Sequence, residues 1–397
     1  MTRSEIILLK LVARAINDDY KLDLSVFDAV NWPDVTALAA RQGVLAIVMD
    51  AISTLPKEKR PTGATLYNAI AQVILMEKAY QRHKNEIRNL ANFYAENGYM
   101  MMLLKGYGLS SCWPIPEHRP VGDIDIFLGR MGMFPAFGKK GVWKEADKVV
   151  KEKLNIIIDN THHHHTVFTY GGISVENHFD FINAYDHFSS HKMERLFKFL
   201  VSQAYVQRDE CKNLYYPSDD FNALFILKHC SGHFASTEVT LRHLLDWLLF
   251  IRKHHDSIDW ELLCSRFRKY GLERLASIFS TIGVKYLGMR QDFFHDFEKD
   301  EGLVCRVLSD ILSPEFSEHE DGTLLSGLWV KPRRFWHNRW KHRLCYSDSF
   351  VSGFIWTTFA KMLKPRHFKV SSEKCHMGAT RWRICGIKYY LLEYERI

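Results

Sequence analysis

The spacing of apolar residues changes abruptly near residue 98, and this change restricts the fold more than any other feature of the chain. From Ser4 to about Asn97, apolar residues recur every three or four positions, which predicts amphipathic helices. Two short apolar segments follow, YMMMLLKG at 99–106 and DIDIFL at 123–128, and each is typical of a single strand. The chain therefore joins a long helical region to a small sheet.

Further elements complete the predicted sheet region and the helices that follow it. Residues 144–154, KEADKVVKEKL, have the spacing of an amphipathic helix. The segments HHHHTVFTY and ISVENHFDF flank Gly171-Gly172 and predict a β-hairpin over 162–181. Helical spacing returns near residue 219 and continues to about Leu312.

These elements predict an α+β protein in which a small mixed-sheet core is flanked by N-terminal and C-terminal helical regions. The expected divisions are a helical region at 1–98, the core at 99–185, a second helical region at 186–330 and a basic aromatic segment at 331–397.

Composition excludes several classes of protein. With 397 residues and 47% hydrophobic content, the chain can form cores in two or three domains. No apolar run approaches the roughly 20 residues of a membrane-spanning helix, and charges appear too early for a secretory signal peptide. The eight cysteines include no Cys-x-x-Cys pair, so we expect reduced thiols and a cytoplasmic protein.

Paired aspartates interrupt the second apolar strand. Residues two apart on a strand point to one face, so Asp123 and Asp125 should lie side by side while Ile124 and Ile126 enter the core. The two carboxylates repel unless a cation lies between them, and Mg²⁺ is commonly held by one or two carboxylates together with substrate phosphates. The alternative is an ordinary solvated strand face.

The predicted hairpin offers a third carboxylate. Glu176, His178 and Asp180 share one face of its second strand, and we expect Glu176 rather than Asp180 to join the aspartates. Three carboxylates on adjacent strands can hold two metal ions about 3.5–4 Å apart, an arrangement suited to in-line phosphoryl displacement.

Lys105-Gly106 ends the strand before the aspartates and opens a short helix. Here bare backbone and free N–H groups could approach a polyphosphate. The alternative is an ordinary strand-to-helix turn.

The segment LLKGYGLSSCWPIPEHRPVGDIDIFL, followed by ISVENHF, resembles the uncharacterised nucleotidyltransferase family of the DNA-polymerase-β-like superfamily, over about residues 5–370. The resemblance implies transfer of a nucleoside monophosphate from an NTP to a hydroxyl or phosphate acceptor, with Mg²⁺ as cofactor and Mn²⁺ as the alternative ion. The acceptor is open: a small molecule, a protein or a nucleic acid. The implied metal-binding and catalytic residues are Asp123, Asp125 and Glu176, and we assign Lys105, Gly106, Arg119 and His178 to nucleotide binding.

Two of these assignments have alternatives. Arg119 could clamp a phosphate bidentately, or it could form a salt bridge that holds its loop. His178 could orient the substrate, or it could hydrogen-bond Glu176 and position that carboxylate.

Other polar residues allow competing interpretations. The four histidines at 162–165, with His178 opposite, could bind a transition metal, but strand alternation would send only every second one to the same face. His233, Arg242, His243 and Asp246 lie on predicted helices that could face the cleft. Arg242 and Asp246 are also spaced as an ordinary i, i+4 helix pair, so we assign none of these four to catalysis.

Two rival functions remain. Tyr107 follows Gly106 where the superfamily usually has glycine or serine, which favours a non-catalytic nucleotide- or partner-binding module on the same fold. The C-terminal segment 331–397 carries 15 Lys/Arg against 4 Asp/Glu, which favours contact of residues 331–343 with nucleic acid or an acidic surface. For those residues the alternative is an amphipathic helix that packs Trp336 and Trp340 onto the domain.

Overall fold

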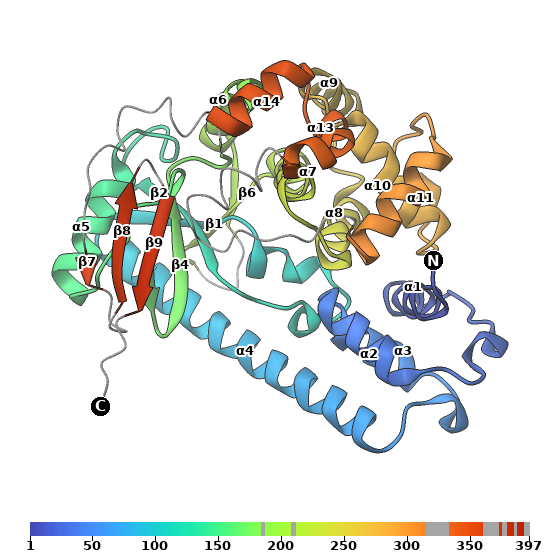
Figure 1. Ribbon diagram of the computed structural model, residues 1–397. Helices are drawn as coiled ribbons and strands as arrows, with labels where there is room; N and C mark the ends of the chain where they lie inside the picture. The colour runs from blue at the N-terminus through green and yellow to red at the C-terminus, as the bar shows by residue number, and fades with distance from the viewer. Residues whose placement is uncertain are drawn as a thin grey trace.

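A six-stranded mixed sheet forms the centre of the α+β fold (Figure 1). The computed structural model describes residues 1–183, 187–207, 212–314, 333–359, 373–374, 379–384 and 387–392. The strand order is β3-β4-β2-β1-β6-β5. The strands are β1 (Tyr99–Leu103), β2 (Ile124–Arg130), β3 (His165–Tyr170), β4 (Ile173–His178), β5 (Tyr205–Gln207) and β6 (Leu214–Pro217).

The register of the central strands brings distant polar residues together. β1 and β2 are antiparallel, and β3 and β4 form the predicted hairpin. β2 and β4 are parallel neighbours, with Asp125 opposite Glu176. Side chains opposite each other on neighbouring strands share a face, so this pairing places the second aspartate beside the expected third carboxylate.

The sheet extends beyond the core expected at 99–185. β5 and β6 lie in the range 186–330, which the sequence predicted to be helical, and β6 pairs with β1 in parallel. Strands of three and four residues are too short to show a clear alternation of apolar and polar residues. Only the pairing of β6 with β1 and of β5 with β6 identifies them.

Helices surround the sheet, and the predicted N-terminal helical region is confirmed. It comprises α1 (Arg3–Ile16), α2 (Trp32–Arg41), α3 (Leu45–Ser53) and α4 (Gly63–Glu96). The later helices are α5 (Val142–Leu154), α6 (Phe188–Gln203), α7 (Asp219–Ser236), α8 (Leu241–His254), α9 (Trp260–Tyr270), α10 (Glu273–Lys285), α11 (Glu301–Leu312), α13 (Arg339–Cys345) and α14 (Phe350–Phe359). None of the helices in the described ranges is long and apolar enough to cross a membrane.

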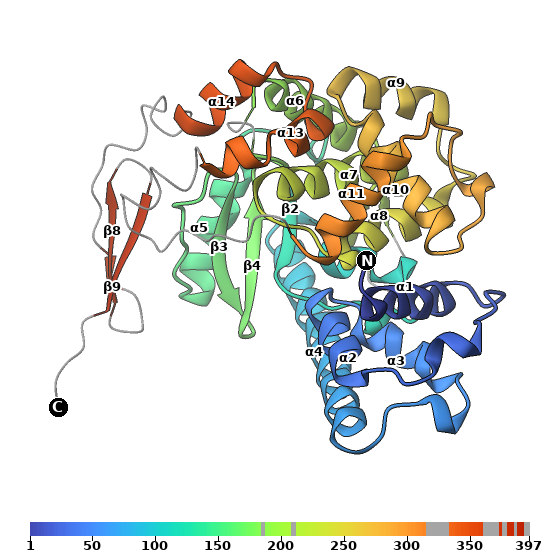
Figure 2. The ribbon, with the colours of Figure 1, turned by 45° about the vertical axis from the view of Figure 1, so that its right-hand side comes forward.

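Two cores form on opposite faces of the sheet because the strands alternate. On one face Ile124 and Ile126 pack with Leu90 and Tyr94 of α4 and with α5. On the other, Phe127 packs with the helical layer that includes α6 and α7. Figure 2 shows α4 on one side of the sheet and α6 and α7 on the other. Asp125 and Phe127 are two residues apart on β2, so Asp125 points towards the helical layer.

Residues 333–359 of the basic C-terminal segment belong to the helical layer. The Lys341 side chain is fully buried, and its Nζ lies 2.6 Å from Asp310 Oδ2 of α11. Trp340 packs against the core, with the Arg306 guanidinium 4.0 Å from its ring centroid. Trp336 is 60% exposed, so only one of the two tryptophans packs as the amphipathic-helix alternative predicted.

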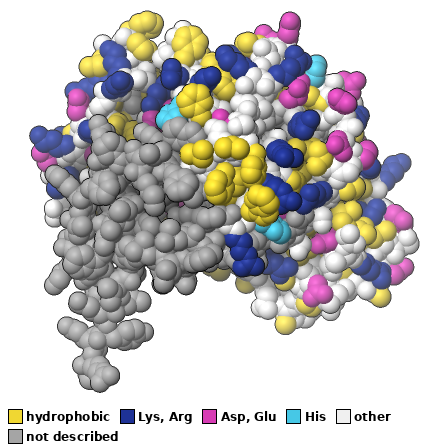
Figure 3. Space-filling model, turned by 45° about the horizontal axis from the view of Figure 1, so that its top comes forward, with side chains coloured by type: hydrophobic (Ala, Val, Ile, Leu, Met, Phe, Trp, Pro, Cys, Tyr) yellow, Lys and Arg dark blue, Asp and Glu magenta, His cyan; other side chains and the backbone are white. Residues whose placement is uncertain are grey.

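Other stretches of segment 331–397 form a small second sheet or lie outside the described residues. Figure 3 shows hydrophobic side chains among Lys and Arg side chains on the face beside the grey atoms. Residues 331–332 and 360–372 lie outside the described residues. Further on, β7 (Glu373–Lys374), β8 (Ala379–Ile384) and β9 (Ile387–Leu392) pair as an antiparallel sheet.

Candidate active site

Asp125 is the centre of a buried cluster of charged and polar groups. Only 4% of the residue is exposed, so its carboxylate needs compensation from nearby donors. Lys105 Nζ lies 2.8 Å from Asp125 Oδ1, and His178 Nε2 lies 3.0 Å from the same oxygen. Burial would raise the pKa of Asp125, but the charge of Lys105 and the His178 hydrogen bond outweigh it, so the pKa is lowered.

Glu176 and His178 extend this cluster along β4. His178 Nε2 lies 3.3 Å from Glu176 Oε2, and potential ligand atoms of Asp125, Glu176 and His178 all lie within 4.8 Å of one another. Burial opposes protonation of His178, but its hydrogen bonds to the two carboxylates raise its pKa. His178 therefore contacts Glu176, as one alternative expected, and it contacts Asp125 as well.

Asp123 lies at the edge of the cluster. It is exposed and directly precedes β2, so it is less enclosed than Asp125. Partial burial and the charge of Glu176 raise the pKa of Asp123, although a hydrogen bond with Ser174 opposes the shift. Lys105 and His178 therefore favour the charged form of Asp125, whereas burial and repulsion by Glu176 disfavour the charged form of Asp123.

A pocket of about 180 Å³ opens between these residues and the helical layer. On the sheet side its lining includes Lys105, Gly106, Asp123 and Asp125; on the helix side it includes Phe225 and His229 of α7 and Arg242, His243 and Asp246 of α8. Gly106 has a φ of +61°, a conformation that disfavours residues with a Cβ atom. The pocket thus combines carboxylates, cations and a bare backbone turn.

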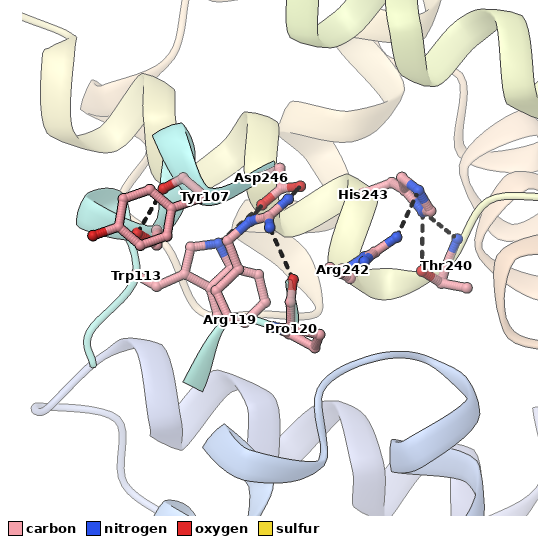
Figure 4. Close-up of polar contacts among 9 residues, drawn as sticks. Tyr107, Trp113, Arg119, Pro120, Thr240, Arg242, His243 and Asp246 are labelled. Carbon is pink, nitrogen blue, oxygen red and sulfur yellow. Dashed lines mark hydrogen bonds and ion pairs between the residues drawn. The ribbon is translucent and has the colours of Figure 1, made fainter. Parts of the chain in front are cut away.

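Arg119 is held by a buried salt bridge. Its Nε and Nη2 each donate to a carboxylate oxygen of Asp246 at 2.8 Å, and Nη1 donates to the Pro120 carbonyl at 2.9 Å (Figure 4). Trp113 Nε1 donates to Asp246 at 3.0 Å. This arrangement is the salt bridge that the sequence left open as the alternative to a phosphate clamp. It joins the loop before β2 to α8.

The same contacts bear on the i, i+4 pair of Arg242 and Asp246 that the sequence allowed as an alternative. Asp246 directs both carboxylate oxygens to Arg119, a residue of another element, rather than serving chiefly as the i+4 partner of Arg242. Arg242 instead donates to His243 at 3.3 Å, as Figure 4 shows. A partner 127 positions away cannot be inferred from helical spacing.

The four histidines at 162–165 depart from the expected alternation, because β3 begins only at His165. The rings of His164 and His165 are 4.3 Å apart between centroids, and that of His165 lies 5.1 Å from that of His178. Burial lowers the pKa of His164 to about 2 and that of His165 to about 3. Both imidazoles are therefore neutral near pH 7.

Sequence reasoning missed or left unassigned several polar residues of the pocket. His229 was not singled out, and Arg242, His243 and Asp246 were noted only as residues whose helices could face the cleft. They lie on the strongly apolar helices α7 and α8, which pack against each other, and both helices contribute to the pocket lining. The only signal in the sequence was a polar residue at an otherwise apolar helical spacing.

Comparison with known proteins adds one match. A family model described as uncharacterised nucleotidyltransferase matches residues 28–287. The matched range lies within the 5–370 expected from the motifs and includes every predicted site residue. No curated protein and no solved structure matches the chain.

Proposed function

The chain belongs to the family of uncharacterised nucleotidyltransferases, and from this premise we propose that it transfers a nucleoside monophosphate from an NTP to a hydroxyl or phosphate acceptor, releasing pyrophosphate. One observation carries the proposal: Asp125 is paired with Glu176 on a parallel strand, and Asp125 lines a pocket together with Lys105 and Gly106. We also propose that the protein acts in the cytoplasm, which agrees with the free cysteines among the described residues.

The carboxylates fit a magnesium site. Oxygen is the ligand atom that Mg²⁺ prefers, and Asp123, Asp125 and Glu176 would supply it. The raised pKa of Asp123 supports this assignment, because a further cation would relieve its repulsion by Glu176. When bound, Mg²⁺ would neutralise the developing charge on the transferred phosphoryl group and align the acceptor.

The remaining roles follow from position and charge. Gly106 would place its backbone against the triphosphate, since no side chain separates it from the pocket. Lys105 and Arg242 would supply positive charge to the phosphates. Glu176, half-buried beside His178, would accept the proton of the attacking hydroxyl.

The contacts of Tyr107 weaken the non-catalytic alternative. Its ring stacks on that of Tyr80 in α4, with 4.9 Å between centroids, and it packs in the core on that side of the sheet. The pocket lining includes Gly106 but not Tyr107. A tyrosine at this position therefore leaves the glycine accessible to a phosphate.

The direct test measures pyrophosphate release with each NTP and Mg²⁺, followed by mass spectrometry of the protein incubated with each NTP and a cell extract. We expect Mg²⁺-dependent pyrophosphate release and one new mass increased by a nucleoside monophosphate. NTP binding without pyrophosphate release under any acceptor condition would instead support the non-catalytic alternative.

Gly106→Ala should weaken Mg²⁺-NTP binding about tenfold, or about 1.4 kcal/mol. An added Cβ would lie 3.5 Å from the Asp123 carbonyl oxygen and 3.8 Å from Asp125 Oδ2, which is ordinary contact without a clash. The substitution should also lower the free energy of unfolding by about 1 kcal/mol because φ is positive. Calorimetric titration of Mg²⁺-NTP into the folded variant measures the affinity.

Gly132→Ala is the matched control for this prediction. Gly132 also has a positive φ, +72°, and an added Cβ there meets no atom within 4 Å. It should show a similar loss of stability with unchanged NTP affinity. Equal NTP affinities for the two variants would reduce Gly106 to an ordinary turn residue.

Glu176→Gln should slow transfer by about 10²-fold, because general-base catalysis typically contributes at least that much. Asp180→Asn should change the rate less than about threefold. Asp180 follows β4 and forms an ion pair with Lys198, so it is engaged away from Asp125. Single-turnover kinetics of both variants distinguish them, and the reverse ranking would move the catalytic carboxylate to Asp180.

A further inference from the structure

Three histidines lie together beside the carboxylate cluster. Potential ligand nitrogens of His164, His165 and His178 all lie within 4.8 Å of one another. They come from the turn before β3, the start of β3 and the end of β4, and the pairing of His165 with His178 brings the two strands into register. The backbone carbonyl of His164 accepts hydrogen bonds from the Phe179 and Asp180 N–H groups at 3.0 and 3.1 Å, which fixes the turn against β4.

Imidazole nitrogens of His164 and His165, but not those of His178, lack hydrogen-bond partners among the described residues. His165 is only 5% exposed, and in the described part of the chain neither its Nδ1 nor its Nε2 has a hydrogen bond. His164 Nδ1 is in the same state. Buried polar atoms in folded proteins nearly always have a partner, so these nitrogens point to a missing one. Glu176 Oε1 lies 3.6 Å from His165 Nε2, beyond a normal hydrogen bond.

We propose that His164, His165 and His178 bind a divalent transition-metal ion of the Zn²⁺ class. Imidazole nitrogen suits Zn²⁺, Ni²⁺, Cu²⁺ and Fe²⁺, whereas Mg²⁺ takes oxygen. Three imidazoles, with water in the fourth position, form a tetrahedral zinc site. Ring rotations would bring nitrogens now within 4.8 Å closer to a common ion.

This site goes beyond the proposed transfer reaction and does not depend on it. It shares only His178 with the carboxylate cluster, and His178 Nε2 is 3.0 Å from Asp125 Oδ1. An ion held by the histidines would therefore lie next to the carboxylates that we assign to Mg²⁺. Its ligands differ in chemical type, so its binding can be measured with no NTP present.

The first test is calorimetric titration of Zn²⁺ into the full-length protein after removal of metals with a chelator. We expect one ion to bind per chain, and His165→Ala to weaken that binding at least tenfold. The control is His163→Ala, which removes an adjacent histidine that lies outside the group of three. Equal effects of the two substitutions, or no effect of His165→Ala in a folded variant, would overturn the proposal.

A second measurement on the wild-type chain keeps the test decisive if His165→Ala does not fold. X-ray absorption of the Zn²⁺-loaded protein should show at least two imidazole ligands per ion, and fewer would overturn the site. Asp123→Asn separates this proposal from the transfer reaction, because that variant should lose transfer but bind Zn²⁺ like the wild type. A protein that binds Zn²⁺ as expected but releases no pyrophosphate would refute only the proposed transfer reaction.

Discussion

Asp125→Asn is expected to reduce nucleotidyl transfer on the order of 10³-fold and also to destabilise the protein. The rate loss follows from removing a metal-binding charge that we estimate contributes about 4 kcal/mol to stabilising the transition state. The stability loss follows from the contacts of the carboxylate, which lies 2.8 Å from Lys105 Nζ and 3.0 Å from His178 Nε2. Losing hydrogen bonds to charged groups should lower the free energy of unfolding by about 1.5–3 kcal/mol.

Asp123→Asn gives the matched comparison. It should also abolish most transfer, but the stability of the metal-free protein should stay unchanged or rise. The pKa of Asp123 is raised, so folding disfavours its ionised form, whereas the pKa of Asp125 is lowered, so folding favours the charge. From the sequence, relief of repulsion was expected for either aspartate; the ion pair with Lys105 reverses that expectation for Asp125.

Melting temperature without metal and turnover with Mg²⁺-NTP, measured on both variants, check this prediction. Wild-type turnover in either variant would contradict the metal assignment. A rise in melting temperature for Asp125→Asn would contradict the role of Lys105 as its neutralising partner.

Lys341→Met should lower the free energy of unfolding by about 3–5 kcal/mol, the usual cost of removing one partner of a buried ion pair. The two side chains are 0% and 1% exposed, and Lys341 Nζ lies 2.6 Å from Asp310 Oδ2. The substitution would leave the Asp310 charge facing an apolar side chain in a buried site. Denaturant unfolding of the variant measures the loss.

Two further variants sharpen this measurement. Arg343→Met removes an exposed cation from the same helix and should change stability by less than about 0.5 kcal/mol. The double variant Lys341→Met, Asp310→Leu should recover most of the loss, because a buried pair can be replaced by apolar residues at little cost. If Lys341→Met lowers the free energy of unfolding as little as Arg343→Met does, the Lys341–Asp310 ion pair contributes nothing to stability.

Local patterns were enough to predict the elements that carry the candidate site. Strand alternation depends only on neighbouring residues, so the sequence predicted that Asp125 would point away from the core formed by Ile124 and Ile126. The same reasoning placed Glu176 and His178 on one face of β4, and they lie 3.3 Å apart. The sequence also predicted that Lys105-Gly106 ends the preceding strand and opens a short helix, which begins at Gly106.

The contacts between distant segments could not be predicted in this way. Nothing near Arg119 indicates that its partner is Asp246, and nothing near Lys341 indicates Asp310, because each pair joins elements that only the packed helical layer brings together. The added strand β6 is likewise recognisable only from its pairing with β1.

By itself, therefore, the sequence determined the α+β class, the positions of most helices and strands and the side of each strand on which its polar residues lie. These properties depend on spacing within a segment. The tertiary structure alone decided which charges are neutralised: Asp125 by Lys105, Asp246 by Arg119, and Asp310 by Lys341. The energy of a buried charge depends on the atoms that surround it in space, and those atoms come from residues far away in the chain.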